Sequence, residues 1–280
     1  MKRLAIVFWL FSLIMVSCKY GDRHDLRDDD SREDSIDTAE VAIADTVEYQ
    51  VEELPMPVTA DELFDDFFFN FASNKPLQMS RIVFPLKVSE GDSIALLSRK
   101  DWQMESFFVE QGYYTLIFDS EAAMEKGKDT SVDSVVVEKI MFDTQTVRCY
   151  NFSRSHGTWM LRSVSDMRMV DNSNFSFLDF YNKFSTDSLY QMGHLNSTVY
   201  FETTDPDDEL ARMDGIITSE MWPAFAPELP SGTLFNVVYG KVDASSATKI
   251  FVIRGISNGL ETELTFIKDR GRWLLTKIIT

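Results

Sequence analysis

The chain has 280 residues and is strongly acidic, with 45 Asp and Glu against 27 Lys and Arg and a formal net charge of −18. This charge repels phosphate groups, and no stripe of basic residues offsets it, so nucleic-acid binding is excluded. The hydrophobic share of 44% and the aromatic share of 13% are enough for folded cores of ordinary domain size.

Residues 1–17 have the pattern of a signal peptide. Lys2 and Arg3 form a short basic region, and the apolar run of residues 4–16 follows it. This run is too short for a membrane-spanning helix, which needs about 20 residues. We therefore expect the segment to direct export and to be removed.

The letters around Met15 and Cys18 resemble the lipobox of bacterial lipoproteins, although Leu is more usual where Met15 stands. The resemblance implies cleavage before Cys18, acylation of Cys18 by chains such as palmitate, and anchoring in the lipid bilayer. The alternative is an ordinary secretory signal followed by an incidental cysteine.

Residues 18–58 are expected to form an acidic, disordered tether. Between Lys19 and Ala60 there are 13 acidic and 4 basic residues, with few large apolar ones. Such a segment buries too little surface to offset its ordering entropy. Its early part, residues 22–34, is similar to signals that send some Gram-negative lipoproteins to the outer face of the outer membrane. The expected location is the cell envelope at the outer membrane, with both the periplasmic and the surface side left open.

A stretch of the chain occurs twice, which predicts two tandem copies of one domain. Five residues recur in the same order and spacing: Phe64, Phe67, Phe71, Gln78 and Met79 return as Phe177, Phe180, Phe184, Gln191 and Met192. The ends of the copies also agree: Phe152, Gly157, Trp159 and Leu161 match Phe266, Gly271, Trp273 and Leu275. Trp102 is set against Trp222 if the second copy carries an insertion. The predicted domains are residues 59–168 and 169–280.

Each copy is predicted to begin with helices and to end with four strands. In the first copy a phenylalanine-striped helix covers residues 60–73, Pro76 starts a shorter helix, a strand lies near a sheet edge at 81–86, and a helix carries Trp102. The closing strands are expected at 112–118, 133–142, 146–154 and 158–165. In the second copy we expect a helix at 174–186, a helix start at Asp205, and strands at 197–201, 233–240, 248–256, 260–268 and 272–279.

This element order, together with the closing Gly-x-Trp-x-Leu hairpins at Gly157 and Gly271, resembles the nuclear transport factor 2-like fold. The resemblance implies an α+β structure made of two tandem cystatin-like cones, each with helices packed on a curved antiparallel sheet and a pocket at its wider end. The phenylalanine helix followed by Gln-Met-x-Arg-Ile and Phe-Pro-Leu also looks like a family of duplicated Gram-negative lipoproteins. That family has been classified only as a domain of unknown function, so the fold is implied and the function is left open.

The residues do not form a recognisable catalytic or metal-binding set. Catalysis in a cone needs an acid and a base held inside it, and zinc needs clustered Cys and His ligands. Cys149 is the one cysteine of the two predicted domains, and we interpret it as a small buried hydrophobic residue on a strand. No cofactor and no metal are expected. The candidate pocket residues are Gln78, Arg81, Gln191 and His194, of which Arg81 and His194 align with each other.

The leading hypothesis is a non-enzymatic envelope lipoprotein of unknown specific function that binds a small molecule, a peptide or a partner protein. One alternative is an envelope hydrolase or isomerase that uses a pocket in one cone. Its candidate residues are Tyr113, Tyr114, Tyr200, Asp179 and His194, and a carboxylate or His paired with a Tyr deep in a cone would support it. Another alternative is a structural scaffold, including a homodimer formed through the sheet faces.

Overall fold

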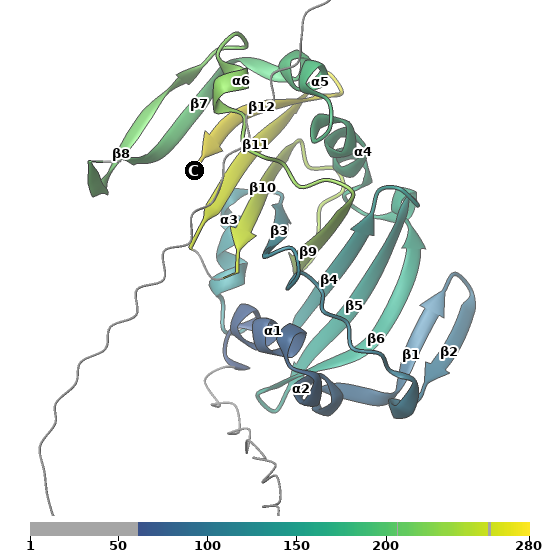
Figure 1. The fold of residues 1–280 in the computed structure, drawn as a ribbon. Helices are drawn as coiled ribbons and strands as arrows, with labels where there is room; N and C mark the ends of the chain where they lie inside the picture. The colour runs from purple at the N-terminus through teal and green to yellow at the C-terminus, as the bar shows by residue number, and fades with distance from the viewer. Residues whose placement is uncertain (1–60, 206, 257–258) are drawn as a thin grey trace, which may run out of the picture. The chain divides into compact units, whose positions relative to one another are not determined.

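The computed structural model describes residues 61–280 except residue 206 and residues 257–258, and the described residues belong to one compact unit (Figure 1). The predicted signal peptide, Cys18 and the acidic tether of residues 18–58 lie outside the described residues. None of the helices in the described part is long and apolar enough to cross a membrane.

The unit consists of two halves with a similar order of elements. The first half contains α1 (Phe64–Ser73), α2 (Lys75–Ser80), β1 (Ile82–Glu90), β2 (Ser93–Leu97), η2 (Arg99–Asp101), β3 (Tyr113–Phe118), α3 (Glu121–Met124), η3 (Glu125–Lys128), β4 (Ser134–Met141), β5 (Thr146–Ser155) and β6 (Thr158–Arg168). The second half contains η4 (Met169–Asp171), α4 (Phe175–Phe184), α5 (Ser188–Gly193), β7 (Leu195–Asp205), β8 (Asp208–Ile217), α6 (Trp222–Phe225), β9 (Thr233–Tyr239), β10 (Thr248–Gly255), β11 (Glu261–Asp269) and β12 (Arg272–Ile279).

The phenylalanine stripes form the buried faces of α1 and α4, as predicted. Phe64, Phe67 and Phe71 on α1 are at most 2% exposed, because residues three and four apart share one face of a helix. The chain leaves α1 at Asn74, whose side chain accepts a hydrogen bond from the Leu77 N–H and caps α2. The same arrangement of a long and a short helix recurs in α4 and α5.

The strand predicted near a sheet edge is β1, which lies next to the edge strand β2. Its pairing with β6 is interrupted between Ile82 and Lys87, the stretch that contains Pro85, since proline cannot donate a ladder hydrogen bond. The strand β2 was not predicted from the sequence. The turn between β1 and β2 contains Gly91 at a φ of 55°, a conformation that glycine adopts without strain.

Two predicted helices are absent. The stretch after η2 contains no regular helix, and Phe107 there has a φ of 48°, which a right-handed helix does not allow. Asp205 begins no helix but ends β7, and its carboxylate accepts a hydrogen bond from the Asp207 N–H in the turn to β8. Asp and Pro favour turns as strongly as helix starts, so the sequence signal at Asp205 is ambiguous.

The twelve strands of the described part form one sheet in which the two halves exchange a strand. The order is β2-β1-β6-β5-β4-β9-β3-β10-β11-β12-β7-β8. Thus β9 of the second half pairs with β4 of the first, and β3 of the first half pairs with β10 of the second. Figure 1 shows β3 and β9 side by side in the middle of this sheet. The sequence predicts two domains with separate sheets, whereas each half here completes its sheet with a strand of the other.

The central strands are covered on both faces by two separate cores. Tyr114, Leu116 and Phe118 of β3 pack in the core that contains α1, while Ile117 between them packs in the core that contains α4. Successive strand residues point to opposite faces, so the helices of the two halves lie on opposite faces of the shared sheet. Nearly every residue of β3 and β9 is buried, which is typical of strands covered on both sides.

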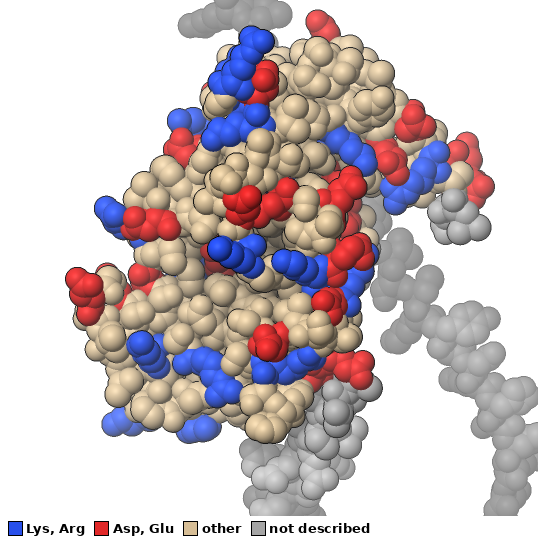
Figure 2. Space-filling view, turned by 180° about the vertical axis from the view of Figure 1, so that it is seen from behind, with Lys and Arg blue, Asp and Glu red and all other residues tan. Residues whose placement is uncertain are grey.

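Lys and Arg are interspersed with Asp and Glu on the face of the molecule shown in Figure 2. Ion pairs such as Arg212 with Glu202, whose atoms lie 2.7 Å apart, and Arg148 with Asp166, also at 2.7 Å, fit this mixture. The basic residues on this face therefore do not gather into one stripe.

Candidate functional site

The two predicted glutamines bind the chain's own loops. Gln78 is fully buried, and its Oε1 accepts hydrogen bonds from Trp102 Nε1 at 3.1 Å and from the Glu105 N–H at 3.3 Å. In the second half Gln191 Oε1 accepts from Trp222 Nε1 at 2.9 Å. The same contact in both halves supports the sequence alignment of Trp102 with Trp222. Each glutamine fixes a tryptophan to a short helix: Trp102 lies in a loop, and Trp222 begins α6.

Arg81 and His194 lie at equivalent positions, at the ends of α2 and α5. Arg81 makes a bidentate ion pair with Asp61, with N–O distances of 3.0 and 2.8 Å. His194 Nδ1 lies 2.8 Å from the Tyr190 carbonyl oxygen, and the two rings are stacked. None of the four predicted pocket residues lines the cavity described below.

The residues considered for an enzyme are dispersed. Tyr200 is 59% exposed on β7, and Asp179 lies on the solvent side of α4 at 3.8 Å from Lys183. Tyr113 lines a separate cavity beside Glu228. Only Tyr114 belongs to the cavity that we consider the candidate site.

The candidate site is a half-open cavity of about 400 Å³ beside α1, within the size range of small-molecule sites. Three aromatic rings form its apolar wall: Phe68 and Phe69 of α1, and Phe108 of the loop before β3. Asp65 of α1 and Arg254 of β10 form its polar wall. The strand exchange brings β10 beside β3, so the site is built from both halves.

A network of hydrogen bonds centred on Asp65 holds the polar wall. Asp65 Oδ1 accepts from the Tyr239 hydroxyl, and Oδ2 accepts from the Tyr114 hydroxyl at 2.9 Å and from an Arg254 nitrogen at 3.2 Å. Arg254 Nε also donates to Glu261 Oε2 at 2.6 Å. The guanidinium therefore has a carboxylate on either side, which fixes its orientation.

Both tyrosines of this network remain protonated donors. Burial, and next the negative charge of Asp65, raise the pKa of Tyr114 above its ordinary value. The same two causes raise the pKa of Tyr239 further. Since a phenol has a single proton to donate, each hydroxyl is committed to Asp65.

Three of the four equivalent positions around the other core are apolar. Tyr114 and Arg254 are cross-strand partners on β3 and β10, and Leu234 and Ile140 are the corresponding partners on β9 and β4. Leu178 follows Phe177 as Asp65 follows Phe64. These three apolar residues, Leu178, Leu234 and Ile140, are all buried in the core of the second half.

Sequence reasoning missed Asp65, Tyr239 and Arg254. A usable signal was present for Asp65, because a position-by-position comparison of the two helices sets this acid against Leu178. No such signal joined it to Tyr239 or Arg254. The hydrogen bond from Arg254 spans 189 positions of the chain, and only the strand exchange brings these residues together.

Comparisons with known proteins agree with this fold. A structure search finds the crystal structure of an NTF2-like protein from Bacteroides fragilis, with 39% identity and a TM-score of 0.74, covering 80% of this chain and 98% of that one. A search of curated proteins returns no match. The family model described as a domain of unknown function, DUF4348, matches residues 43–280. The chain is thus similar to a solved protein described as NTF2-like, and it belongs to this uncharacterised family.

Proposed function

We propose that this protein is an envelope lipoprotein that binds a small organic molecule in the cavity whose polar wall contains Asp65 and Arg254. The observation that carries the proposal is the preorganised polar network on one wall of an aromatic cavity. Sites for small molecules combine apolar walls with a few fixed polar groups in this way.

The fold does not require the polar network. At the corresponding place in the second half, Leu178, Leu234 and Ile140 fill the core with apolar side chains. Partly buried charges are weak evidence for stability, since well-packed apolar residues often serve equally well. Recognition of a ligand explains why Asp65 and Arg254 stand where the other core has Leu178 and Ile140.

The charges around the cavity favour a ligand with a cationic or hydrogen-bond-donating group. Arg254 is the one basic residue among the described residues of the lining, and Asp65 and Asp66 are acidic. Arg254 is moreover paired with both Asp65 and Glu261. An anionic ligand would meet more negative than positive charge, whereas an amine could approach Asp65 and Asp66 beside the phenylalanine rings.

Three matched aromatic probes test the proposal: benzylamine, benzyl alcohol and benzoate, each titrated into the purified protein by calorimetry. We expect saturable binding at one site, tightest for benzylamine and weakest for benzoate. Phe69→Ala removes a ring of the cavity and should weaken all three probes. Leu189→Ala is the control, since Leu189 is 73% exposed on α5 and does not line the cavity.

If no probe saturates, or if Phe69→Ala and Leu189→Ala behave alike, the cavity is not the binding site. A reversed order, with benzoate tightest, would retain the site and overturn the expected charge of the ligand.

Proton-transfer catalysis is the second candidate, favoured by the contact of the Asp65 carboxylate with two tyrosines. The geometry ranks it lower, because the oxygens of Asp65 already accept three hydrogen bonds and have little capacity left to take a proton from a substrate. Exchange of the α-protons of cyclohexanone in D₂O tests it. Faster exchange with the protein than with its Asp65→Asn variant would favour the enzyme, and equal rates would exclude this chemistry.

Membrane anchoring through Cys18 is the part of the proposal that concerns location. It is supported by the lipobox-like residues before Cys18 and by the acidic tether that follows. Metabolic labelling with an alkyne fatty acid tests it, with label expected on the protein and lost in Cys18→Ser. Label that persists in Cys18→Ser would place the acyl chain elsewhere.

The division into two tandem modules, residues 59–168 and 169–280, is likewise a proposal of ours. It is supported by the repeated helix pair, by the repeated Gln–Trp contact and by the closing hairpins at Gly157 and Gly271. A homodimer through the sheet faces is a further expectation, which sedimentation of the purified protein at increasing concentration would test.

A further inference from the structure

A second cavity, of about 360 Å³, lies at the start of α4 in the second half. Its walls include Asn174 and Ser176 of α4 and its cap, Ser245 of the loop before β10, Lys249 of β10, and Lys268 and Trp273 of β11 and β12. Among its described lining residues there are two lysines and no Asp or Glu. Asp119 pairs with Lys249, so Lys268 is the lysine of the lining without an ion-pair partner among the described residues, and its charge points to an anionic ligand.

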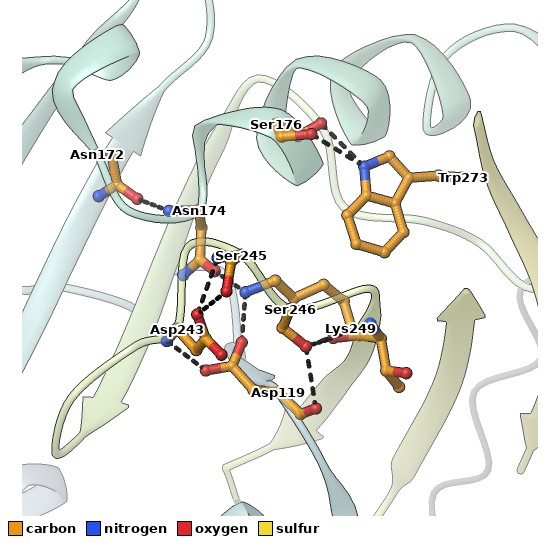
Figure 3. A network of polar contacts seen from close by, with 10 residues as sticks. Asp119, Asn172, Asn174, Ser176, Asp243, Ser245, Ser246, Lys249 and Trp273 are labelled. Carbon is orange, nitrogen blue, oxygen red and sulfur yellow. Dashed lines mark hydrogen bonds and ion pairs between the residues drawn. The ribbon is translucent and has the colours of Figure 1, made fainter. Parts of the chain in front are cut away.

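Lys249 is a buried cation fixed in place by two oxygens. It is 2% exposed, and its ammonium group donates to Asp119 Oδ1 at 2.5 Å and to Asn174 Oδ1 at 2.6 Å (Figure 3). A buried ammonium must be paired and hydrogen-bonded. These contacts orient the carboxamide of Asn174, whose oxygen is occupied by Lys249.

The Nδ2 group of Asn174 is left with no acceptor among the described residues. Asn174 is 2% exposed, and an unpaired buried donor is costly. As the cap of α4 it makes no side-chain bond to the amides of the first turn. An anion at this helix start would meet the free amide donor and the positive end of the helix dipole.

Lys268 supplies the charge that a ligand can reach. Its ammonium group donates to Ser176 Oγ at 2.7 Å and lies 5.4 Å from the centre of the Trp273 ring. Within the described part of the chain no carboxylate lies at ion-pair distance from it, in contrast to Lys249. Trp273 is itself held by Ser176, since its Nε1 donates to the Ser176 carbonyl oxygen at 3.1 Å.

In the first half a cation also lies over the equivalent tryptophan, but it is hydrogen-bonded to the chain's own backbone. Arg154 lies 5.4 Å from the Trp159 ring, as Lys268 does from Trp273. The guanidinium donates to the carbonyl oxygens of Asp61 and Glu62 at 3.3 and 2.8 Å, and also to that of Thr130. Both terminal nitrogens of Arg154 therefore donate to the chain's own backbone, whereas the Lys268 ammonium makes one hydrogen bond among the described residues.

We propose that the cavity at the start of α4 binds a small molecule through a compact oxyanion, a phosphate or a carboxylate group. Lys268 and the Asn174 amide are its donors, Lys249 orients that amide, and Trp273 forms the wall. No residue of this site lines the Asp65–Arg254 cavity, so the two sites can be tested separately.

The test is a titration of the ¹⁵N-labelled protein with inorganic phosphate and, in parallel, with acetate, at constant ionic strength. The indole N–H signal of Trp273, assigned with Trp273→Phe, reports on the site. We expect a saturable shift with at least one anion, and the anion that saturates identifies the group recognised. Lys268→Gln should weaken that binding about tenfold, as expected for the loss of one charge-assisted hydrogen bond, and Lys268→Arg should largely retain it.

Lys183→Gln is the matched control, because it removes the same charge from an exposed side chain of α4. Its anion affinity should equal that of the unmodified protein. A shift that never saturates with either anion, or equal weakening in Lys268→Gln and Lys183→Gln, would show a diffuse effect of charge and overturn the site. Thermal melting confirms that each variant is folded before it is titrated.

Discussion

The two halves of this protein begin with equivalent aromatic helices, but the residue that follows the first phenylalanine of the stripe differs between them. After Phe64 the first half places Asp65, which accepts hydrogen bonds from Tyr114, Tyr239 and Arg254. After Phe177 the second half places Leu178, which is fully buried. Both halves fold around equivalent elements, so packing alone does not dictate a charged group at this position. The difference shows that the fold needs a buried aromatic helix in each half, whereas the charged group at Asp65 is additional to that need.

The largest effect is expected from giving the second half the acid of the first. Leu178→Asp buries a carboxylate in a core that contains no Arg and whose buried Tyr181 already donates to the Pro230 carbonyl oxygen. This should cost more than about 4 kcal/mol and abolish most folding. Circular dichroism during heating measures the loss. Leu189→Asp, at a residue that is 73% exposed, should change little. Similar melting curves for the two variants would contradict the assignment of Leu178 to the core.

The opposite single change, Asp65→Leu, should destabilise the protein less. It leaves the hydroxyls of Tyr114 and Tyr239 without their acceptor, while Arg254 keeps Glu261 and is one-third exposed. We expect a loss of roughly 2–3 kcal/mol in the free energy of unfolding. Urea denaturation measures it. An unchanged midpoint would mean that the network contributes nothing to stability.

A third comparison concerns Glu138 of β4, whose counterpart on β10 is Val252. Asn172 and Asn236 donate to its oxygens at 2.7 and 2.8 Å, and burial raises the pKa of this carboxyl above its ordinary value. The folded state therefore binds a proton more tightly than the unfolded state, so stability falls as the pH rises from the ordinary pKa of Glu through the raised one.

Glu138→Gln removes the ionisable group and should remove this part of the pH dependence. We expect the variant to match the parent in acid and to exceed it in stability at higher pH, as measured by urea unfolding at several pH values. The Asn236 side chain can adapt by an amide flip, because its Oδ1 has no partner in the described part of the chain. Parallel stability curves for the two proteins would sink the prediction.

The smallest change in stability is expected when four residues of the network are replaced together. The combination Asp65→Leu, Tyr114→Leu and Arg254→Ile introduces the apolar residues of the equivalent positions, and Tyr239→Phe added to it leaves no hydroxyl without an acceptor. We expect the free energy of unfolding to stay within about 1 kcal/mol of the parent. Binding of benzylamine should be lost in the same variant. Retained binding would show that the network does not recognise the ligand.

Much of the local structure could be predicted from the sequence. The stripe of Phe64, Phe67 and Phe71 specifies a helix face, and the closing strands follow from alternation and from the turns at Gly157 and Gly271. The predictions from sequence were wrong where one residue type favours two different local structures. Asp205 suits both a turn and a helix start, and Trp102 suits both a helix and an anchored loop.

The site could not be predicted, because its residues meet through pairings between distant segments. Periodicity shows that β3 and β9 are strands, but it does not show which strands they join. Gln78 and Gln191 were recognised as a repeated pair, and their repetition reflects a contact that both halves need for structure. The residues of the candidate site are instead those that the halves do not share, such as Asp65 against Leu178.

The strand exchange also affects how the chain is made. The hydroxyl of Thr115 on β3 bonds to the carbonyl oxygen of Phe235, a partner 120 positions further along. A nascent chain that has emerged only as far as β6 has no β9 to cover the edge of β4, and such open edges attract other strands. Folding with so many distant contacts is slow. We therefore expect this protein to depend on a chaperone until its last strands have emerged, and a truncation that removes β9 and β10 to harm the first half as well as the second.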